Sequence, residues 1–137
     1  VAFNLCGRID AVVARENELA VYEYKTRESM SLAAIKGEVK SAEHMGSNYF
    51  RQIVFYEMLL RGASRLSDKS VSGSIVFLKP NKSGKVPVTA VPVTGQDITN
   101  LKSEIDDLVE SVWSGRFLTD RCADPSCPYC DWKNLLF

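Results

Sequence analysis

Residues 7–25 read GRIDAVVARENELAVYEYK, and this stretch decides the predicted fold. Residues 1–13 carry β-branched and aromatic side chains, residues 14–17 are polar, and residues 19–25 again have the composition of a strand. Two such segments around a short polar turn are typical of an antiparallel hairpin. We therefore predict a hairpin with Asp10 at the end of its first strand and Glu23 to Lys25 at the end of its second.

The remainder of the chain predicts helices and further strands with no internal repeat. Apolar residues nearly encircle the first long helix, which should be largely buried, whereas they form a stripe on the second. The predicted elements are a short helix at 32–35, a helix at 47–60 ended by Gly62, a strand at 72–78, a turn at 80–85, an edge strand at 86–94, a helix at 97–114 followed by Gly115, and an irregular tail at 117–137.

The length and composition predict one α/β domain, a mixed β-sheet flanked by helices. The chain has 137 residues, of which residues 1–116 would form the core and 117–137 a cysteine-bearing tail. Lysine plus arginine and aspartate plus glutamate both number 17, which argues mildly against a stand-alone nucleic-acid binder. No membrane span or secretory signal is visible, so a cytoplasmic location is expected. The first residue is Val1, which fits a piece of a longer parent protein.

Two carboxylates and a lysine are the candidate site. Alternate residues of a strand share a face, so Glu23 and Lys25 point one way while Tyr22 and Tyr24 pack on the other side. One or two carboxylates suffice to hold Mg²⁺, which keeps several of its waters. The cation then offsets charge on a phosphate under attack. The structural alternative is an exposed hairpin end with an ordinary Glu–Lys pair.

The ordered motifs GRID at 7–10, YEYKT at 22–26 and RQIVFY at 51–56 point to a family. Together they resemble the RecB-like branch of the PD-(D/E)XK nuclease superfamily, which includes the nuclease domains of bacterial helicase–nucleases. That branch pairs a G-x-x-D strand with a (D/E)-x-K strand and a later Q-x-x-x-Y helix. The resemblance covers most of the chain and implies a restriction-endonuclease-like core.

The resemblance also implies a role for each matching residue. Asp10 and Glu23 become metal ligands, Tyr24 contributes its main-chain carbonyl, and Lys25 becomes the catalytic lysine. Gln52 and Tyr56 are four apart on one helical face and would line the site, contacting DNA or Lys25. The alternative for these two is a buried tyrosine beside a glutamine that bonds to backbone.

Two features depart from the family pattern. Glu23 occupies a position that is more usually Asp, which the family tolerates. The family also has a preceding helix with a His or Glu ligand, and no such helix precedes Asp10 in this chain. The single histidine, His44, follows the lysine and is expected in a surface loop. A fragment without that helix would bind metal poorly and cut DNA weakly or not at all.

Four cysteines are the remaining candidate ligands. Cys122, Cys127 and Cys130 cluster near the C-terminus, and Cys6 lies in the first predicted strand. The resemblance implies a [4Fe–4S] cluster in some members, which needs four thiolates. The usual spacing of the last ligand fails here, because that position is Leu136. A zinc site and free thiols are the alternatives, with free thiols as the default.

The resemblance predicts a Mg²⁺- or Mn²⁺-dependent deoxyribonuclease, an exonuclease module that works with a helicase domain or subunit of the parent protein in DNA repair or recombination. DNA and that helicase are the expected partners. One alternative is a catalytically impaired DNA-binding or scaffolding domain of the same fold. Another is a metal-binding interaction module built on the cysteine tail. Replacing Lys25 with Ala should abolish cleavage and, as for a surface ion pair, cost at most about 1 kcal/mol of stability.

Overall fold

The computed structural model describes residues 3–66 and 68–136, and the side chains of residues 42–45 and 136 lie outside this description. Contacts group the chain into two units, Val1–Leu101 and Lys102–Phe137. Each unit is described by itself. The prediction of a single domain stays a prediction.

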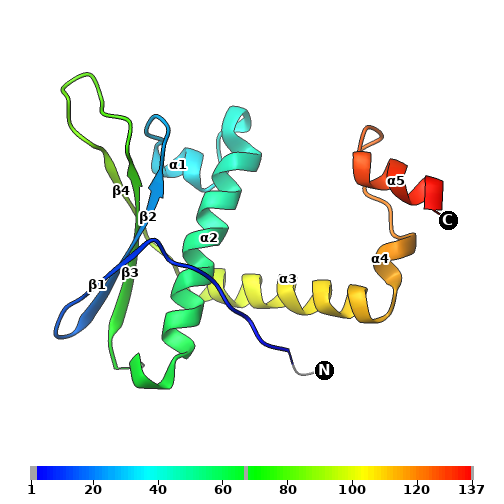
Figure 1. The fold of residues 1–137 in the computed structure, drawn as a ribbon, viewed down its shortest axis with the longest axis horizontal. Coiled ribbons are helices and arrows are strands. Elements are labelled where there is room, and N and C mark those ends of the chain that lie inside the picture. Colours follow the sequence, from blue (N-terminus) through cyan, green and yellow to red (C-terminus); the bar gives the residue numbers. More distant parts are fainter. Residues whose placement is uncertain (1–2, 67, 137) are drawn as a thin grey trace. The chain divides into compact units, whose positions relative to one another are not determined.

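The first unit is built on a mixed four-stranded sheet (Figure 1). Its strands lie side by side in chain order; β1–β2 and β3–β4 pair antiparallel, whereas the central pair β2–β3 is parallel. The predicted mixed sheet flanked by helices is therefore confirmed. The strands are β1 (Ala11–Ala14), β2 (Glu18–Lys25), β3 (Ser70–Phe77) and β4 (Val88–Val91).

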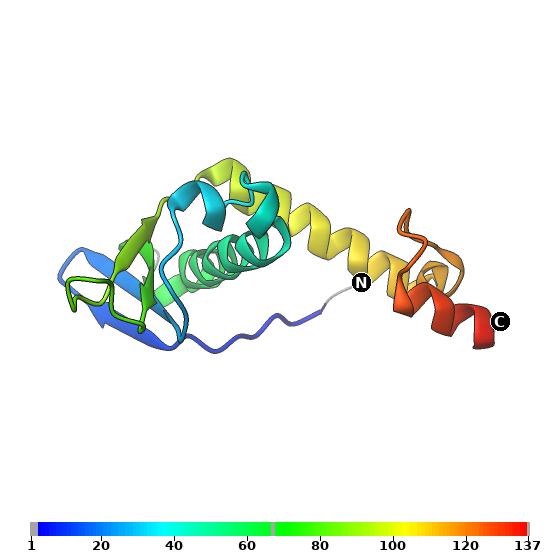
Figure 2. The same cartoon turned by 90° about the horizontal axis from the view of Figure 1, so that it is seen from above.

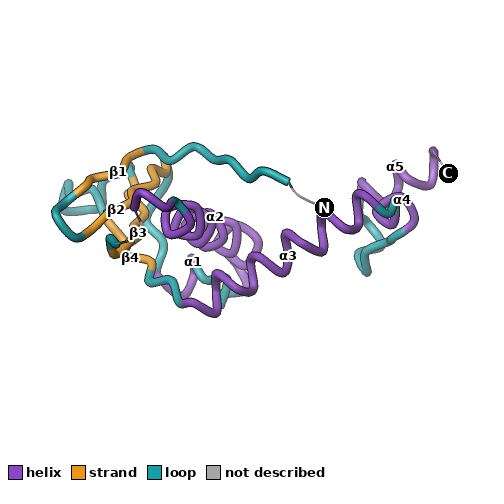
Figure 3. Tube along the Cα trace, turned by 90° about the horizontal axis from the view of Figure 1, so that it is seen from below, coloured by secondary structure: helices purple, strands orange, loops and turns teal. Residues whose placement is uncertain are grey.

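The parallel pair requires a crossover, since parallel strands cannot be joined by a tight turn. The crossover contains α1 (Leu32–Ile35), the 3-10 turns Lys40–Ala42 and Ser64–Leu66, and the long helix α2 (Glu43–Gly62). The Ser31 hydroxyl caps α1 by accepting a bond from the Ala34 N–H. Helices α1 and α2 lie on the same side of the sheet, as the views from above and below show (Figures 2 and 3).

The core lies between α2 and the sheet. Alternate residues of β2 and β3 point at the helix, as the pleat requires, and Val21, Ile75 and Phe77 are fully buried against Ile53 of α2. Tyr24, on the opposite face of β2, is 43% exposed. The predicted alternation is correct, but Tyr24 does not pack as expected because no described helix of the first unit covers that face of the sheet. The face of the sheet that packs against α2 is apolar except near the carboxyl end of β2.

Helix α3 (Gly95–Trp113) leaves the first unit and continues into the second. It begins at a reciprocal cap, in which the Thr94 hydroxyl accepts from the Asp97 N–H and the Asp97 carboxylate accepts from the Thr94 N–H. Gly115, with φ of +75°, stands between α3 and the next helix. The second unit then contains α4 (Arg116–Thr119) and α5 (Pro128–Leu136).

Several predicted boundaries differ from the structure. The first strand covers Ala11–Ala14 rather than residues 1–13, because only that part meets β2. Gly62 is the last residue of α2 and not a cap beyond it. His44 lies in α2 rather than in a loop, and its side chain is outside the description. The tail is partly helical, since Pro128 can begin a helix at its first position. Within the described residues, no helix combines the length and apolar character that crossing a membrane requires.

Candidate active site

Asp10 immediately precedes β1 and lies beside the end of β2. Ala11 pairs with Tyr22 and Val12 with Val21, so one further step of the antiparallel register sets Asp10 opposite Glu23. The Asp10 Oδ2 accepts a bond of 2.9 Å from the Tyr24 N–H. Asp10 was predicted to lie at the end of the first strand. In an antiparallel hairpin that end lies beside the start of the second strand, far from Glu23. In the structure Asp10 instead precedes β1, and it therefore lies beside the end of β2.

Glu23 is a buried carboxylate with three hydrogen-bond donors. The residue is 5% exposed. Its Oε1 accepts from Lys25 Nζ and from Gln52 Nε2, each at 2.7 Å, and its Oε2 accepts from the Tyr56 hydroxyl at 3.2 Å. Burying a charge is costly unless it is paired and hydrogen-bonded, and here both conditions hold. The sheet therefore carries a compensated negative charge on its covered face.

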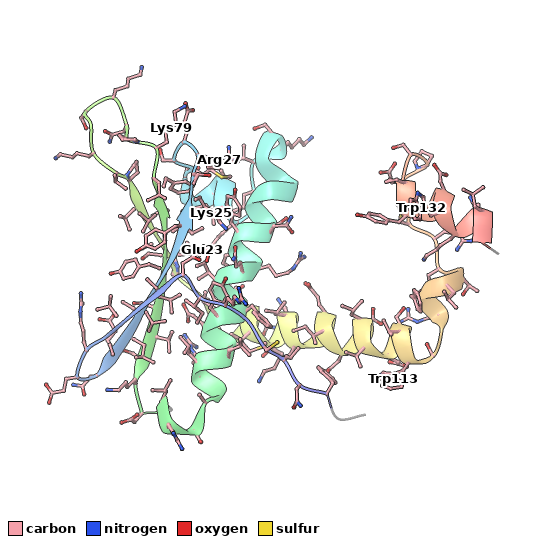
Figure 4. All side chains as sticks on the ribbon, viewed as in Figure 1. Glu23, Lys25, Arg27, Lys79, Trp113 and Trp132 are labelled. Atoms are coloured by element: carbon pink, nitrogen blue, oxygen red, sulfur yellow. The ribbon has the colours of Figure 1, made fainter. Side chains whose placement is uncertain are left out.

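Lys25 is held between β2 and α2. Its ammonium donates to Glu23 Oε1 and, at 2.9 Å, to Gln52 Oε1, and it lies 4.5 Å from the centre of the Tyr49 ring. The side chain is 16% exposed, so solvent still reaches it. Figure 4 shows Glu23 and Lys25 following one another along β2 on the side of α2. An ammonium has three donors, and these two bonds leave one for a water or phosphate oxygen.

Gln52 and Tyr56 extend the network along one face of α2. Gln52 Nε2 donates to the Tyr56 hydroxyl oxygen at 2.7 Å as well as to Glu23. Burial is the main cause that raises the pKa of Tyr56, while the bond from Gln52 opposes it and the charges of Glu23 and Asp10 add to it. The phenol therefore stays protonated at neutral pH and donates to Glu23. The influence of Asp10 also places its carboxylate within electrostatic reach of Tyr56.

The structure thus brings together five predicted residues, Asp10, Glu23, Lys25, Gln52 and Tyr56, through one hydrogen-bonded network and the hairpin register. Tyr24 takes part through its backbone N–H, and its side chain points to the open face. The alternative of a glutamine bonded to backbone does not describe Gln52, which bonds to three side chains. Their catalytic roles, and the carbonyl of Tyr24 as a ligand, stay predictions.

The donor set fits a divalent cation. A carboxylate offers about four acceptor positions, of which Glu23 uses three and Asp10 one in the bonds described above. Asp10 is exposed, so an ion can reach the pair without opening the core. Hard cations such as Mg²⁺ take oxygen ligands from one or two carboxylates and keep water for the rest. Asp10 and Glu23 together meet that requirement.

Two residues near the site were not predicted. Tyr49 carries the ring beside Lys25, and its spacing of three from Gln52 and seven from Tyr56 places all three on one helical face; that spacing could have revealed it. Arg27 follows Lys25 by two residues, and its Nε is buried without a hydrogen-bond partner among the described residues. Nothing in the sequence distinguishes Arg27 from the other arginines of the chain.

The cysteines separate into two places. Cys6 is exposed in the first unit. In the second unit, the sulfurs of Cys122, Cys127 and Cys130 all lie within 4.8 Å of one another. No disulfide joins the described cysteines. The three C-terminal cysteines are therefore close enough together to be ligands of one metal ion.

Comparison with known proteins gives one result. The family model of the PD-(D/E)XK nuclease superfamily matches residues 1–135. A search of curated proteins and a search of solved structures each found no match. The matched segment includes every residue of the network and the three clustered cysteines.

Proposed function

The chain belongs to the PD-(D/E)XK nuclease superfamily, and on that premise we propose that it is a Mg²⁺-dependent deoxyribonuclease with its active site at Asp10, Glu23 and Lys25. Membership implies nuclease-type hydrolysis of phosphodiester bonds, and nucleases of this superfamily typically use divalent metals. The choice of Mg²⁺, with Mn²⁺ as its substitute, and of DNA as substrate belongs to the proposal.

The observation that supports the proposal best is the buried Glu23 carboxylate with its ring of donors. A structural ion pair at a hairpin end would be exposed and would contribute little. Here a 5% exposed carboxylate is bonded to Lys25, Gln52 and Tyr56 from two different elements. Such convergence of polar groups on one charge is typical of functional sites.

Asp10 and Glu23 are the side chains that would hold the cation. A bound divalent cation supplies a Lewis acid, which eases deprotonation of the attacking water and offsets charge on the phosphate. The Glu23 carboxylate is held in one orientation by its three donors. Asp10 is exposed, and the bond from the Tyr24 N–H fixes its Oδ2 at the end of β2.

Lys25 would orient the attacking water and stabilise the charge that develops on the phosphate. Its Nζ is fixed by Glu23 and Gln52, and its third N–H remains for an oxygen of the substrate. A donor that is already oriented stabilises charge in the transition state without reorganisation. Gln52 and Tyr56 position Lys25 and Glu23 relative to each other.

The biological setting is a further part of the proposal. The motif trio that resembles the RecB-like branch supports a nuclease module that acts with a helicase domain or subunit of a parent protein in DNA repair or recombination, in the cytoplasm and as an exonuclease. The competing proposal is a DNA-binding or scaffolding domain with impaired catalysis. Binding of DNA without Mg²⁺-dependent cleavage would favour that alternative.

Asp10→Asn tests the metal site. The amide keeps the size of the side chain and can still accept from the Tyr24 N–H, but it removes the charge that faces solvent. We expect Mg²⁺ affinity to fall by about tenfold or more, because a hard cation with so few protein ligands cannot spare one. Calorimetric titration with Mg²⁺ and cleavage of linear DNA over a Mg²⁺ series measure the two consequences.

Asp106→Asn is the matched control, since Asp106 is an exposed aspartate on α3 outside the network. It should leave both Mg²⁺ affinity and cleavage unchanged. An Asp10→Asn protein that binds Mg²⁺ and cleaves DNA like the unmodified chain would show that the cation is held elsewhere.

A further inference from the structure

The three sulfurs of the second unit are spaced like the ligands of one metal ion. Cys122 Sγ and Cys130 Sγ lie 3.5 Å apart, and Cys127 Sγ is within 4.8 Å of both. With Zn–S bonds of about 2.3 Å, tetrahedral geometry places two sulfurs about 3.8 Å apart. A disulfide would need about 2.05 Å, so the pair is too long for that bond and close to the edge of a tetrahedron.

The same spacing is too short for an iron–sulfur cluster. In a [4Fe–4S] cluster each thiolate binds a different iron, so the sulfurs surround the whole cluster and stand farther apart than ligands of one ion. The cluster also takes four thiolates, and the group of described residues close enough to share an ion contains three. Cys6 belongs to the other unit and is not needed for this group.

The local backbone holds these cysteines close together. Cys127 directly precedes Pro128 at the start of α5, and its carbonyl oxygen accepts from the N–H groups of Cys130 and Asp131. The Cys122 N–H points at Cys130 Sγ at 3.4 Å. Amide hydrogens directed at sulfur stabilise thiolates, which are the form that binds metal. The segment before α5 and the first turn of α5 therefore present their sulfurs to one point.

The second unit needs such a cross-link because its described residues form no apolar core. None of its described residues from 102 to 135 is buried. Trp113 is 69% exposed, and Trp132 and Leu135 of α5 are 71% and 86% exposed. The unit also falls below the roughly 40 residues under which a domain usually requires disulfides, a metal or a partner to be stable. A bound metal would supply what packing does not.

We propose that Cys122, Cys127 and Cys130 bind a single Zn²⁺ as three thiolate ligands, with water in the fourth position, and that this ion holds the second unit together. The ion ties the loop after α4 to the first turn of α5. It is separate from the Asp10–Glu23 pair in ligand chemistry, because soft thiolates favour zinc whereas carboxylates favour magnesium. The proposal does not depend on nuclease activity.

Cobalt titration tests the site directly. The full 137-residue chain, reduced and stripped of metal, is titrated with Co²⁺ while the visible bands of tetrahedral cobalt and the sulfur-to-cobalt charge-transfer band are recorded. We expect one Co²⁺ per chain with a tetrahedral spectrum, displaced by one Zn²⁺. Cys122→Ser should weaken Co²⁺ binding by at least tenfold. Cys122→His should retain one Co²⁺ with a weaker charge-transfer band, because two thiolates remain of three.

Cys6→Ser is the matched control and should titrate like the unmodified chain. Limited proteolysis provides the structural readout: removal of Zn²⁺ should expose cleavage sites in residues 102–137 while the sheet unit stays resistant. A brown protein as isolated, with about four irons and matching acid-labile sulfide, would overturn the proposal. Equal losses in Cys6→Ser and Cys122→Ser, or no stoichiometric binding of Co²⁺ or Zn²⁺, would overturn it as well.

Discussion

Two glutamates are buried among the described residues, and their surroundings differ. Glu23 is held by three donors from β2 and α2. Glu57, 1% exposed, is paired with Arg61 one helical turn on, at 2.6 Å. Burial raises the pKa of Glu57, and Arg61 offsets this only in part. Burial of the Glu23 carboxylate is thus compensated by three hydrogen bonds, whereas burial of the Glu57 carboxylate is only partly compensated by Arg61.

Glu57 should make stability depend on pH. Its pKa in the folded protein lies above the unfolded value of 4.5, so between those two values the folded state binds more protons than the unfolded state. Stability therefore falls as pH rises through that window. When the pH is raised from about 4 to about 7, the free energy of unfolding should fall less in Glu57→Gln than in the unmodified chain. Urea denaturation at both pH values measures the difference.

The control for this experiment is Glu38→Gln, since Glu38 is exposed outside the core. It should follow the pH dependence of the unmodified chain. An identical pH dependence in Glu57→Gln would mean that Glu57 ionises in the folded protein as easily as in the unfolded one.

At this scale the motif residues could be predicted and the surrounding ones could not. Glu23 and Lys25 share a face because strand periodicity is local, and Gln52 and Tyr56 share one because helix periodicity is local. The contact between these two pairs was implied by family resemblance, not by periodicity. The spacing of Tyr49 from Gln52 and Tyr56 could have placed it on the same helical face, but the buried Nε of Arg27 depends on tertiary packing, which no local pattern reports.

Among the elements, the close approach of α2 to β3 fixes the site. Gly73 of β3 allows it, because a Cβ there would lie 2.3 Å from Ile53 Cγ2, a fully buried side chain. Ile53 follows Gln52 directly, so the depth of this contact sets how near α2 brings Gln52 to Lys25. The sequence marked residues 72–78 as a strand but not this glycine as a contact.

Gly73→Ala should destabilise the fold by about 1–3 kcal/mol, the usual cost of adding a methyl group to a filled core. Ile53→Leu removes the branching methyl that the new Cβ would meet, so the double variant should recover part of the loss. Gly62→Ala is the control, because nothing lies within 4 Å of a Cβ there. Urea denaturation gives the free energy of unfolding of the unmodified chain, Gly73→Ala, the double variant and Gly62→Ala. Equal stability of Gly73→Ala and Gly62→Ala would contradict the described packing.

The type of each element was predicted correctly where the periodicity of apolar residues is strong. The extent of a strand was predicted wrongly where it depends on pairing with another strand. The helices α2 and α3 and the strands β2 and β3 agree with the patterns to within a few residues. The first strand was predicted too long, because β-rich composition at residues 3–10 finds no partner strand. The parallel pairing of β2 with β3 joins residues about fifty positions apart and leaves no local signal.

For the whole molecule, the sheet unit accounts for every residue of the proposed active site. The second unit contributes exposed helices and the three cysteines, and its predicted irregular tail contains α5. Family membership rests on the match over residues 1–135. The central claim is that this chain hydrolyses DNA with Lys25 as a catalytic group.

Lys25 requires a careful choice of substitution. The sequence suggested an exposed lysine whose loss costs at most about 1 kcal/mol. In the structure Lys25 is the charged partner of the buried Glu23, and removing one member of a buried pair costs about 3–5 kcal/mol. Lys25→Ala is therefore expected to be unstable as well as inactive. Lys25→Met also loses the charge but keeps the apolar stem beside Tyr49, so it should be less destabilised than Lys25→Ala and is the better variant for measuring catalysis.

The most direct measurement is the single-turnover rate of linear DNA cleavage in Mg²⁺, compared among the unmodified chain, Lys25→Met and Lys79→Ala, each verified as folded by circular dichroism. Lys79 forms an exposed ion pair with Glu28 and serves as the control. We predict Mg²⁺-dependent cleavage that chelator abolishes, a loss on the order of a hundredfold or more in Lys25→Met, and no change in Lys79→Ala. Cleavage that survives in chelator, or an undiminished rate in folded Lys25→Met, would contradict the account.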